Sequence, residues 1–432
     1  MSLPLMISAL WAVLLLALYL WLSRRDPFAV APEWQAGAVI VAVSLLARLV
    51  PELLLPVGAA YDITSYGIVG DLVHQGRDIY ASPAALNRYP YLPLQLYWMA
   101  FAGSLSDGAH LPFVAVVRLA PIAADVGIAL VLWTSLRRSV ELSRFAFQGA
   151  LLYAINPLPV LVSAYHGQFD AIPLLCILLA MRSLPALPLV AGGWLGLGIL
   201  DKSWPVLLGP SLLLIAQSWR GRLRFVAGVA LVPLAGIVIY LLAFDAQIGT
   251  MFERVLGYNR GVGVWGYTYF FNLLGNLWPE LNGIFLWFVL FGKYLTLAAL
   301  AVVWLLRARH EPPAASTLTV LVAFLAVTHA FSIQYLTWLV PFAILGGEIR
   351  WLTRYTLGAF AYMLLAYTTL ILEMHITNLL PWPQADWFII IPAGLPAWFV
   401  TVAWLRQRLR GEQPGIRTPD PIYRAVVPNE QL

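Results

Sequence analysis

Residues Ala59 to Ala100 read AAYDITSYGIVGDLVHQGRDIYASPAALNRYPYLPLQLYWMA, and this polar stretch interrupts a sequence that is otherwise almost continuously apolar. Of the 432 residues, 61% are hydrophobic and only 11% are charged, and the mean hydropathy is +0.79. Apolar runs of about 15 to 25 residues, the length that crosses a bilayer, recur on both sides of the stretch. Because these runs are solid rather than alternating, they indicate helices, and the sequence predicts an all-α polytopic membrane protein.

The charge pattern excludes other classes. The net charge is +5, but the basic residues fall in short clusters between apolar runs, which is typical of orientation signals, so no nucleic-acid partner is expected. The single cysteine, Cys176, lies in an apolar run and excludes an intramolecular disulfide. The run from Leu3 to Leu22 has no basic residue before it and no small-residue cleavage pattern after it, so a retained helix is expected rather than a signal peptide.

The basic clusters also predict the topology. With all of them on the cytoplasmic side, the chain is expected to form a bundle of about 11 to 13 transmembrane helices. The expected helices lie near 3–22, 34–56, 112–136, 145–163, 171–184, 186–200, 205–217, 225–243, 281–306, 316–331, 336–347, 356–373 and 387–405. The segment 92–105 is expected as an interfacial helix, because only one of the two apolar runs between neighbouring arginine clusters can cross.

This topology predicts one transmembrane domain over residues 1–410. Its first extracytoplasmic loop spans 57–111 and carries interfacial helices, a second spans 244–280, and residues 411–432 form a disordered cytoplasmic tail. A few basic residues fall in outer segments, against the orientation rule, and therefore need a functional reason: Arg77, Arg88, Lys202, Arg254 and Arg260.

The polar side chains gather in the outer segments. Besides the two long loops, these segments are the corners 165–170, 201–205 and 331–335 and the stretch 374–386. All of them lie on one predicted face of the membrane. This distribution indicates a site at the membrane surface rather than a channel with charges at mid-depth.

The order of motifs in these segments resembles that of a known family. The first loop holds Asp62-Ile63-Thr64, Asp71, the stretch from Gly76 to Tyr80, and Arg88-Tyr89-Pro90-Tyr91-Leu92-Pro93-Leu94. Asp125, then His166-Gly167-Gln168-Phe169-Asp170-Ala171, then Lys202 with Pro205, and then Phe331-Ser332-Ile333-Gln334-Tyr335-Leu336-Thr337-Trp338 with Pro341 follow in the same order. Over about residues 57–345, this set resembles the GT-C membrane glycosyltransferases, in particular the catalytic subunit of the glycosylphosphatidylinositol mannosyltransferase and bacterial polyprenol-phosphate-mannose-dependent mannosyltransferases.

The resemblance implies an inverting glycosyltransferase whose donor is a sugar on a lipid monophosphate. We therefore expect a hexose, mannose by the resemblance, to pass from polyprenyl phosphate to a lipid-linked or cell-envelope glycan. The implied location is a bacterial inner membrane, with the site on the extracytoplasmic side. The family's first loop usually shows two adjacent acids, whereas this chain has Thr64 two positions after Asp62, so the sequence supports neither a divalent metal nor another cofactor.

Asp62 is the expected catalytic base. An acceptor hydroxyl is a poor nucleophile, so a carboxylate within about 3 Å must take its proton as the new bond forms. Asp62 follows directly on a membrane exit and matches the family's first-loop carboxylate. The alternative is that it caps a helix predicted from Ile63 to Gly76.

Cations are expected at the donor phosphate, because a phosphate leaves readily when its charge is stabilised. Arg260, Lys202 and Arg254 are the candidates on the outer side. For Arg254 the alternative is an ion pair with Glu253 or Asp245.

Sugar or acceptor contacts are expected from a further set of outer residues: His166, Gln168, Asp170, Asp71, Arg88 and Tyr335. The alternatives are that Asp170 caps the next helix and that His166 is a satisfied interfacial histidine. The aromatic residues Trp265, Tyr267 and Tyr269 either stack on a sugar or belong to an interfacial aromatic belt.

Two other functions compete with this hypothesis. A lipid-linked sugar flippase would need inverted repeats and broken helices with charges at the midplane, and neither is clear in the sequence. A glycan ligase or polymerase would also use outer-loop arginines but would take a pyrophosphate-linked carrier. No phosphate-binding loop, dinucleotide fingerprint or zinc spacing occurs, which argues against an enzyme that uses a soluble nucleotide.

Overall fold

The computed structural model describes residues 3–26, 33–54, 59–138, 142–258, 261–372 and 388–411. Within these residues the chain is helical, and the only pairing of extended backbone is an isolated bridge between Val262 and Ala330. The prediction of an all-α polytopic membrane protein is confirmed. The expected tail lies outside the described residues beyond Gly411.

The helices follow the predicted apolar runs closely in the first part of the chain and less closely later. The α-helices are α1 (Leu3–Leu22), α2 (Glu33–Leu54), α3 (Ala60–His74), α4 (Gln95–Ala109), α5 (Phe113–Leu136), α6 (Ala146–Ile155), α7 (Pro157–Val160), α8 (Ala171–Ser183), α9 (Pro188–Asp201), α10 (Gly209–Leu213), α11 (Trp219–Phe244), α12 (Ile248–Leu256), α13 (Gly266–Leu277), α14 (Asn282–Leu306), α15 (Pro313–Val327), α16 (Leu339–Leu345), α17 (Ile349–Leu372) and α19 (Leu395–Leu409). Tighter or wider turns precede or join several of them, notably η1 (Pro83–Ala85), the π-helical turn η3 (Leu161–His166), η4 (Trp204–Leu208) and η7 (Ile333–Thr337).

Five segments of the described chain are long and apolar enough to cross a bilayer: Glu33–Leu53, Phe113–Leu136, Ser143–His166, Trp219–Phe244 and Pro279–His310. The other apolar helices of the bundle, such as α8, α9 and α15, have fewer than 18 residues. The total of about 11 to 13 crossings therefore stays a prediction.

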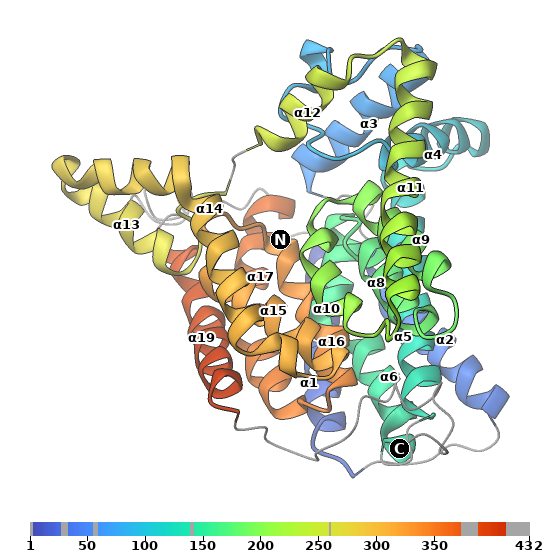
Figure 1. Cartoon of the computed structure of the whole chain (residues 1–432), viewed down its shortest axis with the longest axis vertical. Helices are drawn as coiled ribbons and strands as arrows, with labels where there is room; N and C mark the ends of the chain where they lie inside the picture. The colour runs from blue at the N-terminus through green and yellow to red at the C-terminus, as the bar shows by residue number, and fades with distance from the viewer. Residues whose placement is uncertain are drawn as a thin grey trace.

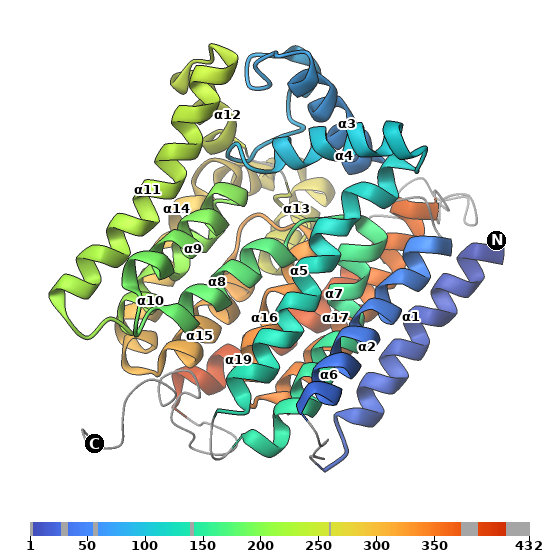
Figure 2. The same cartoon turned by 90° about the vertical axis from the view of Figure 1, so that its right-hand side faces the viewer.

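The helices α3, α4 and α12, which lie far apart in the sequence, meet at one end of the bundle. Figure 1 and Figure 2 show α3, α4 and α12 together at the top, where the long helix α11 also ends, and Figure 2 shows α4 running across the bundle end above α5 and α8. This orientation agrees with the interfacial helix expected at 92–105. The observed helix α4 overlaps that segment and begins and ends a few residues later. A small apolar core, which includes Val69, Leu96 and Met99, holds this end together.

Glycines let two neighbouring helices approach closely below this end. A Cβ on Gly192 of α9 would lie 2.0 Å from the Phe225 carbonyl oxygen, and one on Gly228 of α11 would lie 2.2 Å from that of Leu189. Small residues at such positions drive helix association in membranes, where apolar burial gives no net gain. The close packing of α9 on α11 fixes the position of the end of α9, which Lys202 follows directly.

Two features differ from the sequence-based expectation. The second outer loop, 244–280, contains the helices α12 and α13, which lie on either side of the chain segment around Gly261. The predicted helix 145–163 is broken, because Asn156 ends α6 and Pro157 starts α7, and η3 follows. A proline has no N–H for the helical ladder, and the Asn156 side chain accepts the hydrogen bond from the Leu158 N–H instead.

Two pairs of opposite charges lie inside the bundle. Arg48 of α2 donates to the Asp125 carboxylate of α5 at 2.8 Å, and both side chains are almost fully buried. Arg118 of α5 lies 3.5 Å from Glu52 and donates to the Tyr165 carbonyl oxygen at 2.8 Å. Breaking a buried pair leaves an uncompensated charge, so these contacts hold α2, α5 and η3 in a fixed arrangement.

Candidate functional site

Asp62 lies in the first turn of α3, and its carboxylate faces the bundle. The Oδ2 atom accepts two hydrogen bonds, from His166 Nε2 at 2.6 Å and from Gln168 Nε2 at 2.7 Å. The residue at the N-cap of α3 is Ala59, and no side chain caps that helix end. Asp62 is therefore not a helix cap, and the alternative interpretation of this residue is wrong.

A tight turn at the end of η3 presents both donors to Asp62. Gly167 has a φ of +85°, a left-handed conformation that glycine adopts without strain. A Cβ at this position would meet Ile63 at 3.1 Å and Arg118 at 3.4 Å. Glycine is needed here for both reasons, and the turn places His166 and Gln168 on the same carboxylate oxygen.

The hydrogen bonds continue on both sides of Asp62 and form one network. On one side, His166 Nδ1 lies 2.9 Å from the Tyr367 hydroxyl of α17. On the other side, the Gln168 Oε1 accepts from Lys202 Nζ at 3.0 Å. Lys202 follows α9 directly, and its ammonium group brings a positive charge into the network.

The network ends at the start of α8. Lys202 Nζ donates to Asp170 Oδ2 at 2.7 Å, and Trp338 Nε1 donates to Asp170 Oδ1 at 2.8 Å. The indole of Trp338 stacks on Trp204 with ring centroids 3.9 Å apart. Asp170 occupies the N-cap position of α8, but its side chain makes no capping bond, so it is a network residue and not a cap.

The environment keeps Asp62 ionised. Burial opposes its charged form, but the hydrogen bonds from His166 and Gln168 and the positive charge of Lys202 outweigh burial and hold the pKa of this carboxyl below its ordinary value. The side chain of Asp62 is 27% exposed, whereas those of His166 and Lys202 are each 5% exposed. Within the described residues Oδ1 takes part in no hydrogen bond, so its lone pairs are available to accept a proton.

Aromatic residues border the network on its outer side. The Lys202 ammonium lies 5.2 Å from the ring centroid of Tyr91. Burial raises the pKa of Tyr91, and the nearby charges of Asp62 and Asp170 raise it further, followed by smaller effects of Tyr258 and Tyr335. Tyr91 is thus near groups from α3, from the start of α8, from the segment after α12 and from η7.

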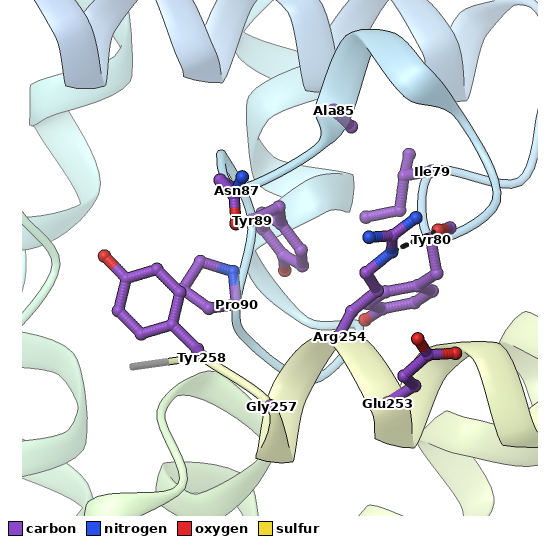
Figure 3. Close-up of a pocket in the computed structure, with 10 residues that line it drawn as sticks. All are labelled: Ile79, Tyr80, Ala85, Asn87, Tyr89, Pro90, Glu253, Arg254, Gly257 and Tyr258. Carbon is purple, nitrogen blue, oxygen red and sulfur yellow. Dashed lines mark hydrogen bonds between the residues drawn. The ribbon is translucent and has the colours of Figure 1, made fainter. Parts of the chain in front are cut away.

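A cavity of about 200 Å³ lies next to the chain segment that contains Tyr91, because Tyr89 and Pro90 line it. Figure 3 shows Tyr258, which follows α12, beside Pro90, and Arg254 of α12 reaching toward Tyr80. Arg254 Nε donates to the Tyr80 carbonyl oxygen at 3.1 Å, and Figure 3 shows its guanidinium apart from the Glu253 carboxylate. Among the described residues Arg254 forms no ion pair with an acid, so the alternative role given to it is not observed.

The structure brings together the sequence-predicted residues Asp62, His166, Gln168, Asp170 and Lys202 in one network. Tyr335 lies beside it, with its ring centroid 4.3 Å from that of Trp338. Arg88 lies over the Tyr61 ring at 5.1 Å and donates to Ser65 Oγ at 3.1 Å, both on α3.

Other predicted residues are not part of this network. The Asp71 side chain is exposed on α3, about 13 Å further along the helix axis than Asp62. Arg260 lies outside the described residues. Trp265 is 2% exposed, stacks on Phe331 and donates to a backbone carbonyl, so it belongs to the core and not to a belt or a sugar platform.

Sequence reasoning missed several residues that shape the site. Tyr367 and Trp338 anchor its two ends, and Tyr91 covers Lys202. Tyr66, one turn after Asp62, is buried, and its hydroxyl has no partner within the described residues. The i, i+4 spacing of Asp62 and Tyr66 on α3 was the available signal for the last of these.

The described residues contain no group of three or more His, Cys, Asp or Glu side chains suited to hold a metal ion. The expectation that the sequence supports no metal or other cofactor stays a prediction.

Comparison with known proteins gives a match to one family model. The model of glycosyltransferase family 87 matches residues 89–329, which is more than half of the chain. The matched range includes four members of the network, from His166 to Lys202, and begins after Asp62. No curated protein and no solved structure gives a match. This family belongs to the GT-C-like membrane glycosyltransferases, which confirms the resemblance found in the sequence. The chain is a member of glycosyltransferase family 87.

Proposed function

We propose that this glycosyltransferase moves a hexose, with mannose as the expected sugar, from polyprenyl phosphate to a hydroxyl of a lipid-linked or cell-envelope glycan. The observation that carries the proposal is the ionised carboxylate of Asp62, which has one oxygen held by two donors and the other open. A group of this kind is what a transfer to a hydroxyl needs as its base. The family membership supports sugar transfer as the reaction.

In the proposed reaction, the acceptor hydroxyl gives its proton to Asp62 Oδ1 while its oxygen attacks the anomeric carbon. The bond between the anomeric carbon and the phosphate oxygen breaks on the opposite face, so the configuration inverts. The electron pair of the broken bond leaves with polyprenyl phosphate, which needs no proton. His166 and Gln168 hold the other oxygen of Asp62 and fix the direction of Oδ1.

The donor phosphate is proposed to contact Arg254 and Arg260, with Lys202 as a third cation. Arg254 lines the cavity beside Tyr258. Arg260 lies outside the described residues, so its proposed role rests on the sequence alone.

The proposed roles of the remaining polar residues concern the sugar and the acceptor. Asp170 accepts hydrogen bonds from both Lys202 and Trp338, and it is proposed to orient the lysine. Arg88 lies against α3, where it contacts Tyr61 and Ser65, and it is proposed to bind the acceptor.

A transfer assay tests the proposed donor. The full-length protein, purified into liposomes, is given polyprenyl phosphate carrying radiolabelled mannose, with a lipid extract of the source membranes as acceptor. We expect labelled glycolipid and free polyprenyl phosphate in equal amounts, and product linkages of inverted configuration. Equal or better use of a pyrophosphate-linked donor would make the enzyme a ligase or polymerase. Movement of the labelled lipid across the bilayer without transfer would make it a transporter.

Cysteine labelling tests the proposed extracytoplasmic location. The only natural cysteine, Cys176, is buried, so new cysteines report on their own positions. Asp71→Cys and Arg222→Cys exchange exposed residues near the two ends of the bundle. We expect an impermeant maleimide outside intact cells to label position 71 and not position 222. Labelling of both from the same side would overturn the topology.

A further inference from the structure

A second hollow lies far from the candidate site. Its volume is about 870 Å³, and it opens between the end of α1, the start of α17 and the end of α19. From Ile349 to Tyr367, which contacts His166, α17 rises about 27 Å at 1.5 Å per residue. Figure 2 shows the end of α1 at the bottom of the bundle and α3 and α4 at the top. The hollow and the site are thus separated by roughly the thickness of a bilayer core.

The hollow carries excess positive charge. Arg24, Arg350 and Arg354 line it, and within the described residues the first two form no ion pair. The acid in its wall, Glu348, is already bound by Arg408 and accepts a hydrogen bond from Trp404 Nε1.

The arrangement of the arginines carries a cost in the absence of an anion. Arg350 and Arg354 are four residues apart in the first turns of α17, and like charges at this spacing repel. The Arg354 guanidinium lies over the Trp351 ring at 5.0 Å, which fixes it at the rim of the hollow. The positive end of the α17 dipole adds to the same field. An anion between these groups removes the repulsion and satisfies the guanidinium donors.

A neighbouring groove indicates what kind of anion fits. It has a volume of about 560 Å³ and runs along α1, lined by Ala17, Leu20, Trp21, Arg24 and Arg25. Arg24 belongs to both hollows, so the apolar groove and the arginine-lined hollow are contiguous. A free phosphate ion makes no favourable contact with an apolar groove, whereas a lipid has a charged headgroup for the arginines and an apolar chain for the groove.

We propose that these two hollows bind an anionic membrane lipid. Its phosphate headgroup sits between Arg24, Arg350 and Arg354, and one of its chains lies along Leu20 and Trp21. Basic pockets between transmembrane helices are established sites for anionic headgroups, and the geometry here adds the tail. The lipid is a structural ligand that joins α1 to α17 and takes no part in sugar transfer.

Binding to the delipidated full-length protein tests the proposal. The ligands are dioleoylphosphatidylglycerol, the zwitterionic dioleoylphosphatidylcholine, and glycerol 3-phosphate as a headgroup without tails. Native mass spectrometry and the rise in unfolding temperature measure binding. We expect the anionic lipid to bind at least tenfold more tightly than either comparator. Equal affinity for phosphatidylcholine, or for glycerol 3-phosphate, would overturn the proposed lipid site.

A matched pair of variants separates this site from general surface charge. Arg350→Gln with Arg354→Gln is expected to weaken binding of the anionic lipid at least tenfold. The control is Arg220→Gln with Arg224→Gln, which removes two exposed arginines at the same spacing from the start of α11. Equal losses in the two double variants would refute a built site. Should the first double variant fold poorly, Arg24→Gln, an exposed residue after α1, is expected to lose binding severalfold, and unchanged binding would refute the proposal.

Discussion

Asp62→Asn is the sharpest perturbation of the proposed mechanism. The asparagine oxygen can replace Oδ2 and keep the hydrogen bonds from His166 and Gln168, which are 2.6 and 2.7 Å long in the wild type. The amide nitrogen then occupies the position of Oδ1, where it donates instead of accepting. The acceptor hydroxyl therefore loses its base while the fold keeps its contacts.

The expected loss is a factor of about 10² to 10⁴ in kcat, the range for removal of a positioned base, or about 3 to 5.5 kcal/mol of barrier. KM for the donor is expected to change little, because the carboxylate acts on the acceptor proton in the transition state. Initial rates at saturating donor, with equal amounts of purified protein in liposomes, measure the effect.

Asp71→Asn is the matched control for this prediction. It makes the same exchange on the same helix, at an exposed side chain outside the network, and its rate is expected to stay within about twofold of the wild type. The assignment of the base is wrong if Asp62→Asn keeps more than about a tenth of the rate while Asp71→Asn does not.

Three further predictions concern the network and the cavity. Gln168→Leu removes one hydrogen bond that lowers the pKa of Asp62, so the pKa rises and the acid limb of the kcat/KM profile moves to higher pH; an unmoved limb would exclude Asp62 as the titrating base. Lys202→Met leaves Asp170 buried without its cation and is expected to lower the free energy of unfolding by about 3 to 5 kcal/mol. In the double variant, Asp170→Asn is expected to restore part of this loss. Strictly additive losses in denaturant unfolding would show that the two residues are not coupled. Arg254→Ala is expected to weaken donor binding about ten- to 150-fold and Arg254→Lys to recover only part, because lysine lacks the planar fork; an unchanged donor affinity of the alanine variant would remove this residue from the phosphate site.

The long helices could be predicted because their signal is local. A run such as Phe113 to Leu136 satisfies both length and hydropathy by itself, and the interfacial α4 was identified from the count of arginine clusters. Helix α12 was missed because nine residues with only one apolar face give no membrane signal. The break at Asn156 was missed because the run around it is apolar throughout.

The candidate site was predictable in its members but not in its contacts. Each polar residue was recognised because it stands at an outer corner of an apolar chain. Asp62 and His166 are 104 positions apart, and no local pattern pairs them. Tyr367 lies inside an apolar helix, where a tyrosine is most often a core residue, so its contact with His166 had no sequence signal.

The charges of the network place a condition on donor binding. The proposed polyprenyl-phosphate donor carries one negative charge, and an ionised Asp62 carries another. At about 6 Å and an effective dielectric of about 20, their repulsion is about 3 kcal/mol, and it acts to raise the pKa of Asp62 when the donor binds.

Transfer moves this charge rather than creating it. When Asp62 takes the proton it becomes neutral, and the phosphate leaves with two negative charges. Lys202 is already held by Asp170 and Gln168 and balances only one carboxylate. The cations that stabilise the leaving phosphate must therefore stand nearer to it than to Asp62, because a cation equally close to both would gain nothing as the charge moves. Arg254, which lines the cavity, is proposed to be such a cation, and for this reason the donor phosphate is expected on the α12 side of Tyr91 and the acceptor on the α3 side.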